Sequence, residues 1–100
     1  MWQERRELEI GRLRDVIDEI DGDLVDKIAQ RMELSEEIAK IKAEHGLPIY
    51  VPWREQEILD KRREWGLGHG LSQEFIRDLF ELIMSESKRR QRELIKAKNC

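Results

Sequence analysis

Four polar side chains occupy positions where two helical apolar stripes should continue. The first stripe runs through Arg31, Ser35 and Ile38 to Lys42, so that it includes two cations, while the second continues onto Ser87 and Gln91. The apolar members of the two stripes recur at steps of three and four and are Ile10, Leu13, Ile17, Ile20, Leu24 and Ile28, and then Phe75, Leu79 and Ile83. Side chains on such a stripe point toward a core, where a charge is costly unless a partner pairs it. Two cations and two neutral hydrogen-bonding groups directed inward therefore predict a buried pocket for an anionic ligand.

Each of these residues also has an ordinary structural interpretation. Arg31 and Lys42 can flank a coiled-coil seam, with packed stems and with heads in water. Ser87 can bond to the carbonyl of Ile83 within its own helix, and Gln91 can be a surface residue. The prediction of a site depends on the joint pattern and not on any single position.

The elements that must position these residues are helices. The 100-residue chain has no threonine, three valines and no alternating strand pattern, which predicts an all-α protein. Helices are expected over about residues 3–45, 53–65 and 72–97, in one domain covering residues 1–100. Glycines make residues 66–70 a predicted turn, and Ser72 is the expected N-cap of the last helix.

The length of the first helix predicts a dimer. About 43 residues form a helix of roughly 64 Å, whereas a 100-residue globule has a radius of gyration of about 13 Å. The apolar stripe must therefore be covered by a second copy, in an intertwined antiparallel homodimer. Arg14 lies about 25 Å along the helix from Arg31, so the partner's Arg14 is the one expected near Arg31 and Lys42. Two equivalent sites, each built from both chains, follow from the twofold symmetry.

Composition excludes several other classes of function. Charged residues make up 41% of the chain but the net charge is only −3, and Lys88–Arg92 is the one locally basic stretch, which is too narrow for a nucleic-acid partner. No segment is apolar enough to span a membrane, and residues 1–9 do not form a signal peptide. The single cysteine, Cys100, excludes an intrachain disulfide and fits a cytoplasmic protein. His45 and His69 lack the spacing of a metal site.

The chain resembles the all-helical class of chorismate mutases over roughly residues 8–95. The combination of segments, in this order and in a chain of this length, carries the resemblance. The matching segments are Leu13–Asp21, Ile28–Arg31 with Leu34, Ile38–Lys42, Leu47–Ile49, Pro52–Glu55, Leu79–Ser87 and Gln91.

The resemblance implies a three-helix protomer in an intertwined dimer and the conversion of chorismate to prephenate, on the route to phenylalanine and tyrosine. This reaction is a one-step pericyclic rearrangement. It needs no metal, no organic cofactor and no nucleophile. The expected partners are therefore a small-molecule substrate and a second copy of the chain.

The resemblance also implies roles for individual residues. Arg31 and the partner's Arg14 resemble the two arginines that hold the substrate carboxylates, a task that suits the planar fork of Arg. Lys42 and Gln91 resemble the pair that donates hydrogen bonds to the ether oxygen. Negative charge grows on that oxygen as the C–O bond breaks, so fixed donors there stabilise the transition state more than the ground state.

The remaining implied site residues lie near the second and third helices. Glu55 resembles the acid that accepts a hydrogen bond from the ring hydroxyl, and Arg54 and Ser87 match positions that help to hold the carboxylates. Val51 stands where the family often has a small acidic or amide residue. Its backbone amide can still donate to the substrate.

Two other functions compete with this interpretation. The related isochorismate-pyruvate lyases share the Arg-Lys skeleton, but Glu55 and Ser87 favour a mutase, because the lyases tend to be apolar or aromatic at those positions. A helical dimerisation module without catalysis would explain the mixed charge and the long amphipathic helix. It would not explain why four polar groups replace stripe residues.

Overall fold

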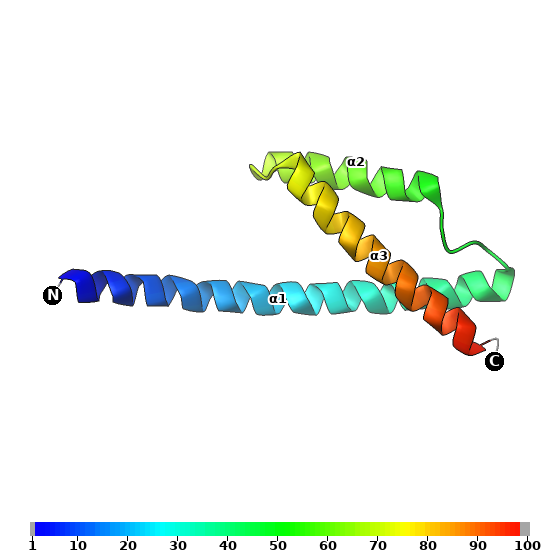
Figure 1. Ribbon diagram of the computed structural model, residues 1–100, viewed down its shortest axis with the longest axis horizontal. Coiled ribbons are helices and arrows are strands. Elements are labelled where there is room, and N and C mark those ends of the chain that lie inside the picture. The colour runs from blue at the N-terminus through cyan, green and yellow to red at the C-terminus, as the bar shows by residue number, and fades with distance from the viewer. Residues whose placement is uncertain (1, 99–100) are drawn as a thin grey trace. The chain divides into compact units, whose positions relative to one another are not determined.

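The described residues of the computed structural model, 2–98, form three helices: α1 (Trp2–His45), α2 (Pro52–Gly68) and α3 (Gln73–Lys98) (Figure 1). The predicted all-α class and the very long N-terminal helix are thereby confirmed. Cys100, on which the prediction about disulfides rests, lies outside these residues. None of the three helices is apolar enough over a sufficient length to cross a membrane.

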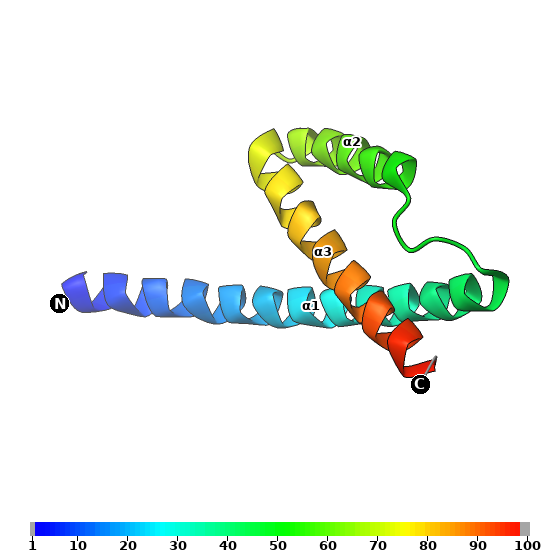
Figure 2. The same cartoon turned by 45° about the vertical axis from the view of Figure 1, so that its right-hand side comes forward.

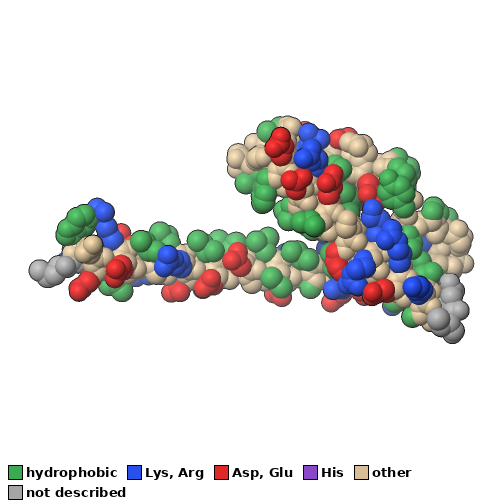
Figure 3. Space-filling model, viewed as in Figure 1, with side chains coloured by type: hydrophobic (Ala, Val, Ile, Leu, Met, Phe, Trp, Pro, Cys, Tyr) green, Lys and Arg blue, Asp and Glu red, His purple; other side chains and the backbone are tan. Residues whose placement is uncertain are grey.

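The chain divides into two units, residues 1–31 and residues 32–100. The first unit is the N-terminal part of α1, and its apolar side chains are exposed along the helix (Figure 3). The predicted stripe is 39% to 65% exposed at Ile10, Leu13, Ile17, Ile20, Leu24 and Ile28. Exposure of this much regularly spaced apolar surface is unusual for a protein that acts as a single chain.

The second unit contains the end of α1 together with α2 and α3. Its α3 folds back from the end of α2 and crosses the C-terminal part of α1 (Figures 1 and 2). The buried apolar side chains come from all three helices and are Met32, Ala39, Ile58, Ile76 and Met84. This small core places the inner faces of α1 and α3 against each other.

The inner faces differ from the predicted stripes by about one residue. On α1, Ser35 of the predicted stripe is buried, but the other buried residues are Met32 and Ala39, and the predicted Ile38 is 49% exposed. On α3, Ile76 is buried and the predicted Phe75 is 55% exposed. The spacing of apolar residues predicts the buried face of a helix only to within about one position. The helix that packs against this face determines which residues lie at its centre.

The predicted end of α2 is wrong. The helix was expected to stop at Trp65 before a turn, but it continues through Gly66 to Gly68. Gly66 is in the helix because α3 approaches closely there: a Cβ on Gly66 would lie 2.6 Å from Cγ1 of Ile76. The turn comes later, where the N–H of Leu71 donates to the Gly66 carbonyl at 2.8 Å and Gly70 has φ +72°.

Two details of the helix ends also bear on the predictions. Trp65, the predicted last residue of the second helix, is 57% exposed, and the guanidinium carbon of Arg62 lies 4.6 Å from the centroid of its ring. The predicted N-cap of α3 is confirmed, because the N–H of Phe75 donates to Ser72 Oγ at 3.2 Å. The cap satisfies one of the free N–H groups of the first turn.

Substituting the two helical glycines of α2 tests the close packing of α2 on α3. Gly66→Ala should destabilise the protein by about 1–3 kcal/mol, the usual cost of overpacking a tight contact. Gly68→Ala is the matched control, since a Cβ there meets nothing within 4 Å. It should be neutral or stabilising by up to about 1 kcal/mol. Urea unfolding at a fixed protein concentration measures both, and equal effects would contradict the packing argument.

Candidate functional site

The polar groups on α3 face the C-terminal part of α1. Gln91 Nε2 donates to both the backbone carbonyl and the Oγ of Ser35, each at 2.9 Å. One turn earlier, the Oγ of Ser87 lies 3.5 Å from Sδ of Met32. Gln91 and Ser87 are only 6% and 8% exposed. Their predicted inward orientation is confirmed, whereas their chemical roles stay predictions.

Ser35 is a residue of this cluster to which the sequence analysis assigned no role. It lies on the face of α1 between Arg31 and Lys42, and a small polar side chain at that position was the available signal. Its two oxygens accept both N–H groups that an amide side chain possesses. Ser35 therefore fixes the orientation of the Gln91 amide.

Lys42 lies in the last turn of α1 and is half-buried. Its Nζ donates to the carbonyl of Ile49 at 3.0 Å, and its own carbonyl accepts the N–H of Leu47 at 2.8 Å. Gly46, with φ +64°, turns the chain after the helix. The ammonium is favoured at the negative end of the helix dipole. One of its three hydrogens is used by Ile49, which leaves others to reach a ligand.

Glu55, in the first turn of α2, is joined to α3 by Lys88. The Nζ of Lys88 lies 3.0 Å and 3.2 Å from the two carboxylate oxygens of Glu55. The Lys88 and Glu55 side chains are 23% and 24% exposed. Lys88 Nζ also lies 4.9 Å from the centroid of the Tyr50 ring. In the sequence Lys88 is distinguished only as part of a basic stretch, and nothing in the local pattern indicates this contact.

Val51 and Arg54, at the start of α2, make hydrogen bonds and ion pairs with residues of α2 itself. Val51 is half-buried in an extended conformation, and its carbonyl accepts the N–H groups of Arg54 and Glu55 at 3.1 Å and 3.2 Å. The exposed guanidinium of Arg54 pairs with Glu57, which lies one turn later on the same helix. The pKa of the neighbouring Arg62 is lowered by burial and by the positive charge of Arg54.

The two arginines expected to hold carboxylates belong to the first unit, residues 1–31. Arg14 is exposed on α1, and Arg31, at the end of this unit, is half-buried. The functions of both arginines stay predictions.

Most of the basic stretch Lys88–Arg92 is engaged in ion pairs. Arg89 pairs with Glu86 and Glu93, and Arg90 lies 3.3 Å from Glu36 of α1. The hydrogen bond from Arg89 lowers the pKa of Glu86, and the same contact raises the pKa of Arg89. The basic side chains that gather over α3 in Figure 3 are thus largely paired with carboxylates of their own chain.

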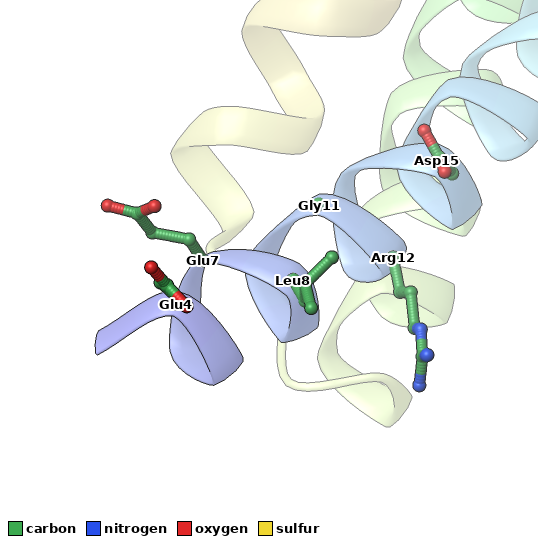
Figure 4. A pocket seen from close by; sticks show the side chains of 6 residues that line it. All are labelled: Glu4, Glu7, Leu8, Gly11, Arg12 and Asp15. Atoms are coloured by element: carbon green, nitrogen blue, oxygen red, sulfur yellow. The ribbon is translucent and has the colours of Figure 1, made fainter. Parts of the chain in front are cut away.

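A hollow on the first unit offers a poor site for an anion. Its lining comes from successive turns of α1 alone and consists of Glu4, Glu7, Leu8, Gly11, Arg12 and Asp15. Figure 4 shows that the side chains of Glu7, Arg12 and Asp15 point in different directions. Three carboxylates and one guanidinium that do not converge cannot hold a dianion, so the candidate site remains the inner face of α1 and α3.

Comparison with known proteins identifies a family that matches most of the chain. The family described as chorismate mutase type II matches residues 13–92, from the turn of α1 that carries Arg14 to the residue after Gln91. A chorismate mutase of Methanocaldococcus jannaschii is 30% identical over 86 residues, covering 86% of this chain and 87% of the relative. A 4-amino-4-deoxychorismate mutase of Streptomyces venezuelae is 35% identical over 78 residues, covering 78% and 76%.

Some relatives are much longer than this chain. A T-protein of Enterobacter agglomerans is 42% identical over 79 residues, which is 79% of this chain but only 21% of that protein. The chain therefore spans about a fifth of the length of this relative. The three helices, the polar inner face and the match over most of the sequence lead to one assignment: the chain belongs to the type II family of chorismate mutases.

Proposed function

We propose that this chain converts chorismate to prephenate. The observation that carries the proposal is the family match, which includes every candidate site residue from Arg14 to Gln91. The test is direct: the absorbance of chorismate should decay on adding the purified protein, with prephenate as the product. Decay at the uncatalysed rate would refute the proposal.

One relative introduces a competing substrate. The protein from Streptomyces venezuelae is a 4-amino-4-deoxychorismate mutase, and that compound carries a ring amine where chorismate carries a ring hydroxyl. We take chorismate as the substrate of this chain. A reducing, cytoplasmic setting belongs to the same proposal, because one cysteine cannot form an intrachain disulfide.

The active form in this proposal is an antiparallel homodimer with two sites. Its support is the exposed apolar stripe of residues 10–28, whose side chains are at least 39% exposed in one chain. Covering them with a second copy contributes roughly 25 cal/mol for each Å² removed from water. Each site would then combine Arg31 and Lys42 of one chain with the partner's Arg14.

Lys42 and Gln91 are the proposed donors to the ether oxygen. Lys42 keeps ammonium hydrogens beyond the one used by Ile49. Gln91 uses both amide hydrogens on Ser35, so binding of the ether oxygen exchanges the bond to Ser35 Oγ for one to the substrate. The bond to the Ser35 carbonyl keeps the amide oriented, and donors held in place need no reorganisation as charge develops.

The other residues position the substrate. The two carboxylates are proposed to be bound by Arg31, Ser87 and the partner's Arg14. Arg54 also binds them after leaving its pair with Glu57. An exposed ion pair of this kind contributes little to stability, so breaking it costs little. The backbone amide of Val51 donates a hydrogen bond to the substrate, and Glu55 accepts a hydrogen bond from the ring hydroxyl. Together these contacts select the compact conformer in which the reacting carbons are close.

Replacing Lys42 tests the donor role. Lys42→Ala should lower kcat by about 10²–10³-fold, the usual loss for one fixed donor to a developing oxyanion. Lys40→Ala is the matched control, because Lys40 is exposed on the same helix, and its rate should match the parent. Turnover of chorismate by the Lys42→Ala variant within a few-fold of the parent would remove Lys42 from the mechanism.

Replacing the amide of Gln91 by an acid tests the second donor. A neutral amide donates at any ordinary pH, whereas a carboxylic acid donates only when protonated. The ionised form places a negative charge against the oxygen that is itself becoming negative. The rate of Gln91→Glu should therefore rise as the pH falls and be low at neutral pH. A pH–rate profile as flat as that of the parent would exclude Gln91 from the ether-oxygen role.

Mixed dimers test whether Arg14 acts at the partner's site. Arg14→Ala and Lys42→Ala homodimers should each be nearly inactive. After unfolding and refolding together in equal amounts, about half the dimers are mixed, and each of these has one intact site and one doubly defective site. The mixture should recover roughly a quarter of parental activity. Each variant refolded alone is the control. Mixed dimers that form without recovering activity would show that Arg14 does not serve a shared site.

A further inference from the structure

The ion pair between Lys88 and Glu55 involves the carboxylate to which the proposed function assigns the ring hydroxyl of the substrate. Lys88 follows Ser87 on α3, and Glu55 follows Arg54 on α2. The Lys88 Nζ is 3.0 Å and 3.2 Å from the two carboxylate oxygens. Both side chains are about three-quarters buried, so water screens the pair only in part.

Lys88 is also held from another side. Its Nζ lies 4.9 Å from the centroid of the Tyr50 ring, within the range of a cation–π contact. Tyr50 precedes α2 in the chain, so the ammonium is fixed by groups from two segments outside its own helix. Such a fixed charge acts on whatever binds next to Glu55 and does not swing away into water.

A carboxylate paired in this way still accepts hydrogen bonds but attracts cations weakly. The two oxygens of a carboxylate offer about four lone pairs, so a neutral hydroxyl can donate to Glu55 while Lys88 remains in place. A ligand ammonium at the same point would be attracted by Glu55 and repelled by Lys88 at similar distances, and the two Coulomb terms largely cancel. The guanidinium of Arg54, the residue before Glu55, is also positive and so adds no attraction for a ligand ammonium.

We propose that Lys88 is a specificity-determining residue, which makes the site select a ring hydroxyl and reject a ring ammonium. This inference rests on the proposed function, in which Glu55 accepts a hydrogen bond from the ring hydroxyl of chorismate. The substrate class it assigns is the neutral, hydroxyl-bearing dicarboxylate, and the excluded class is the analogue with a protonated amine at that ring carbon. Lys88 itself does not touch the reacting bonds.

The experiment compares kcat/KM for chorismate and for 4-amino-4-deoxychorismate in the full chain. The parent should prefer chorismate. Lys88→Gln can still hydrogen-bond to Glu55 but carries no charge. It should shift the ratio of the two kcat/KM values toward the amine by about 10-fold or more, mainly through a lower KM for the amine. A 10-fold shift corresponds to about 1.4 kcal/mol. Lys88→Met, which removes both the charge and the hydrogen bond, should shift the ratio in the same direction.

Two controls isolate the position and the charge. Lys88→Arg keeps the charge and should keep the parental ratio to within about 2-fold, or about 0.4 kcal/mol. Lys96→Met removes one positive charge from an exposed position on the same helix and should also leave the ratio unchanged. A merely structural tie between α2 and α3 would change stability in the Lys88 variants without changing the ratio.

The outcomes separate this inference from the proposed function. A parent that turns over chorismate, with the same substrate ratio in folded Lys88→Gln and Lys88→Met, overturns the role of Lys88 and leaves the proposed function standing. A parent that uses both substrates equally also overturns it. A parent without chorismate turnover overturns the proposed function, and the inference falls with it.

Discussion

The hydrogen bonds from Gln91 to Ser35 are the interaction on which the inner face of the protein depends. They join α3 to α1 across 56 positions in the sequence, in the middle of a core that has few large apolar side chains. A buried amide that loses its partners costs about 1–3 kcal/mol. The two helices are therefore held in a defined rotation about their axes, because another rotation would leave the amide unsatisfied. The same bonds set the direction of the one amide that the proposed chemistry needs.

The candidate site shows how a small helical protein can position donors with contacts between helices and to one connecting segment. Lys42 is fixed by the end of α1 and the carbonyl of Ile49, and Glu55 is fixed by Lys88. Each of these side chains is thus held by a contact to another segment of the chain, which limits its motion within the site. Preorganised donors of this kind are effective when a reaction develops charge but forms no covalent bond to the protein. The proposed rearrangement is such a reaction.

The exposed stripe of the first unit links stability to association. Its apolar side chains have the spacing of a core face and yet lie open in a single chain. In the proposed homodimer the energy of covering this stripe would supply much of the stability that the small core of the second unit lacks. Folding and assembly would then be one equilibrium, which depends on protein concentration. Catalysis would depend on the same interface, since Arg14 would reach a site only across it.

The sequence by itself determined the helices, the inward placement of Ser87 and Gln91, and the family. These follow from residue spacing and from local end signals such as Ser72, which act over a few positions along the chain. Only the tertiary structure decided that α2 continues through Gly66, that Ser35 receives Gln91, and that Lys88 holds Glu55. Those contacts join residues 10, 56 and 33 positions apart. Periodicity cannot specify which side chains meet at such separations, because that depends on how closely and at what rotation one helix packs on another.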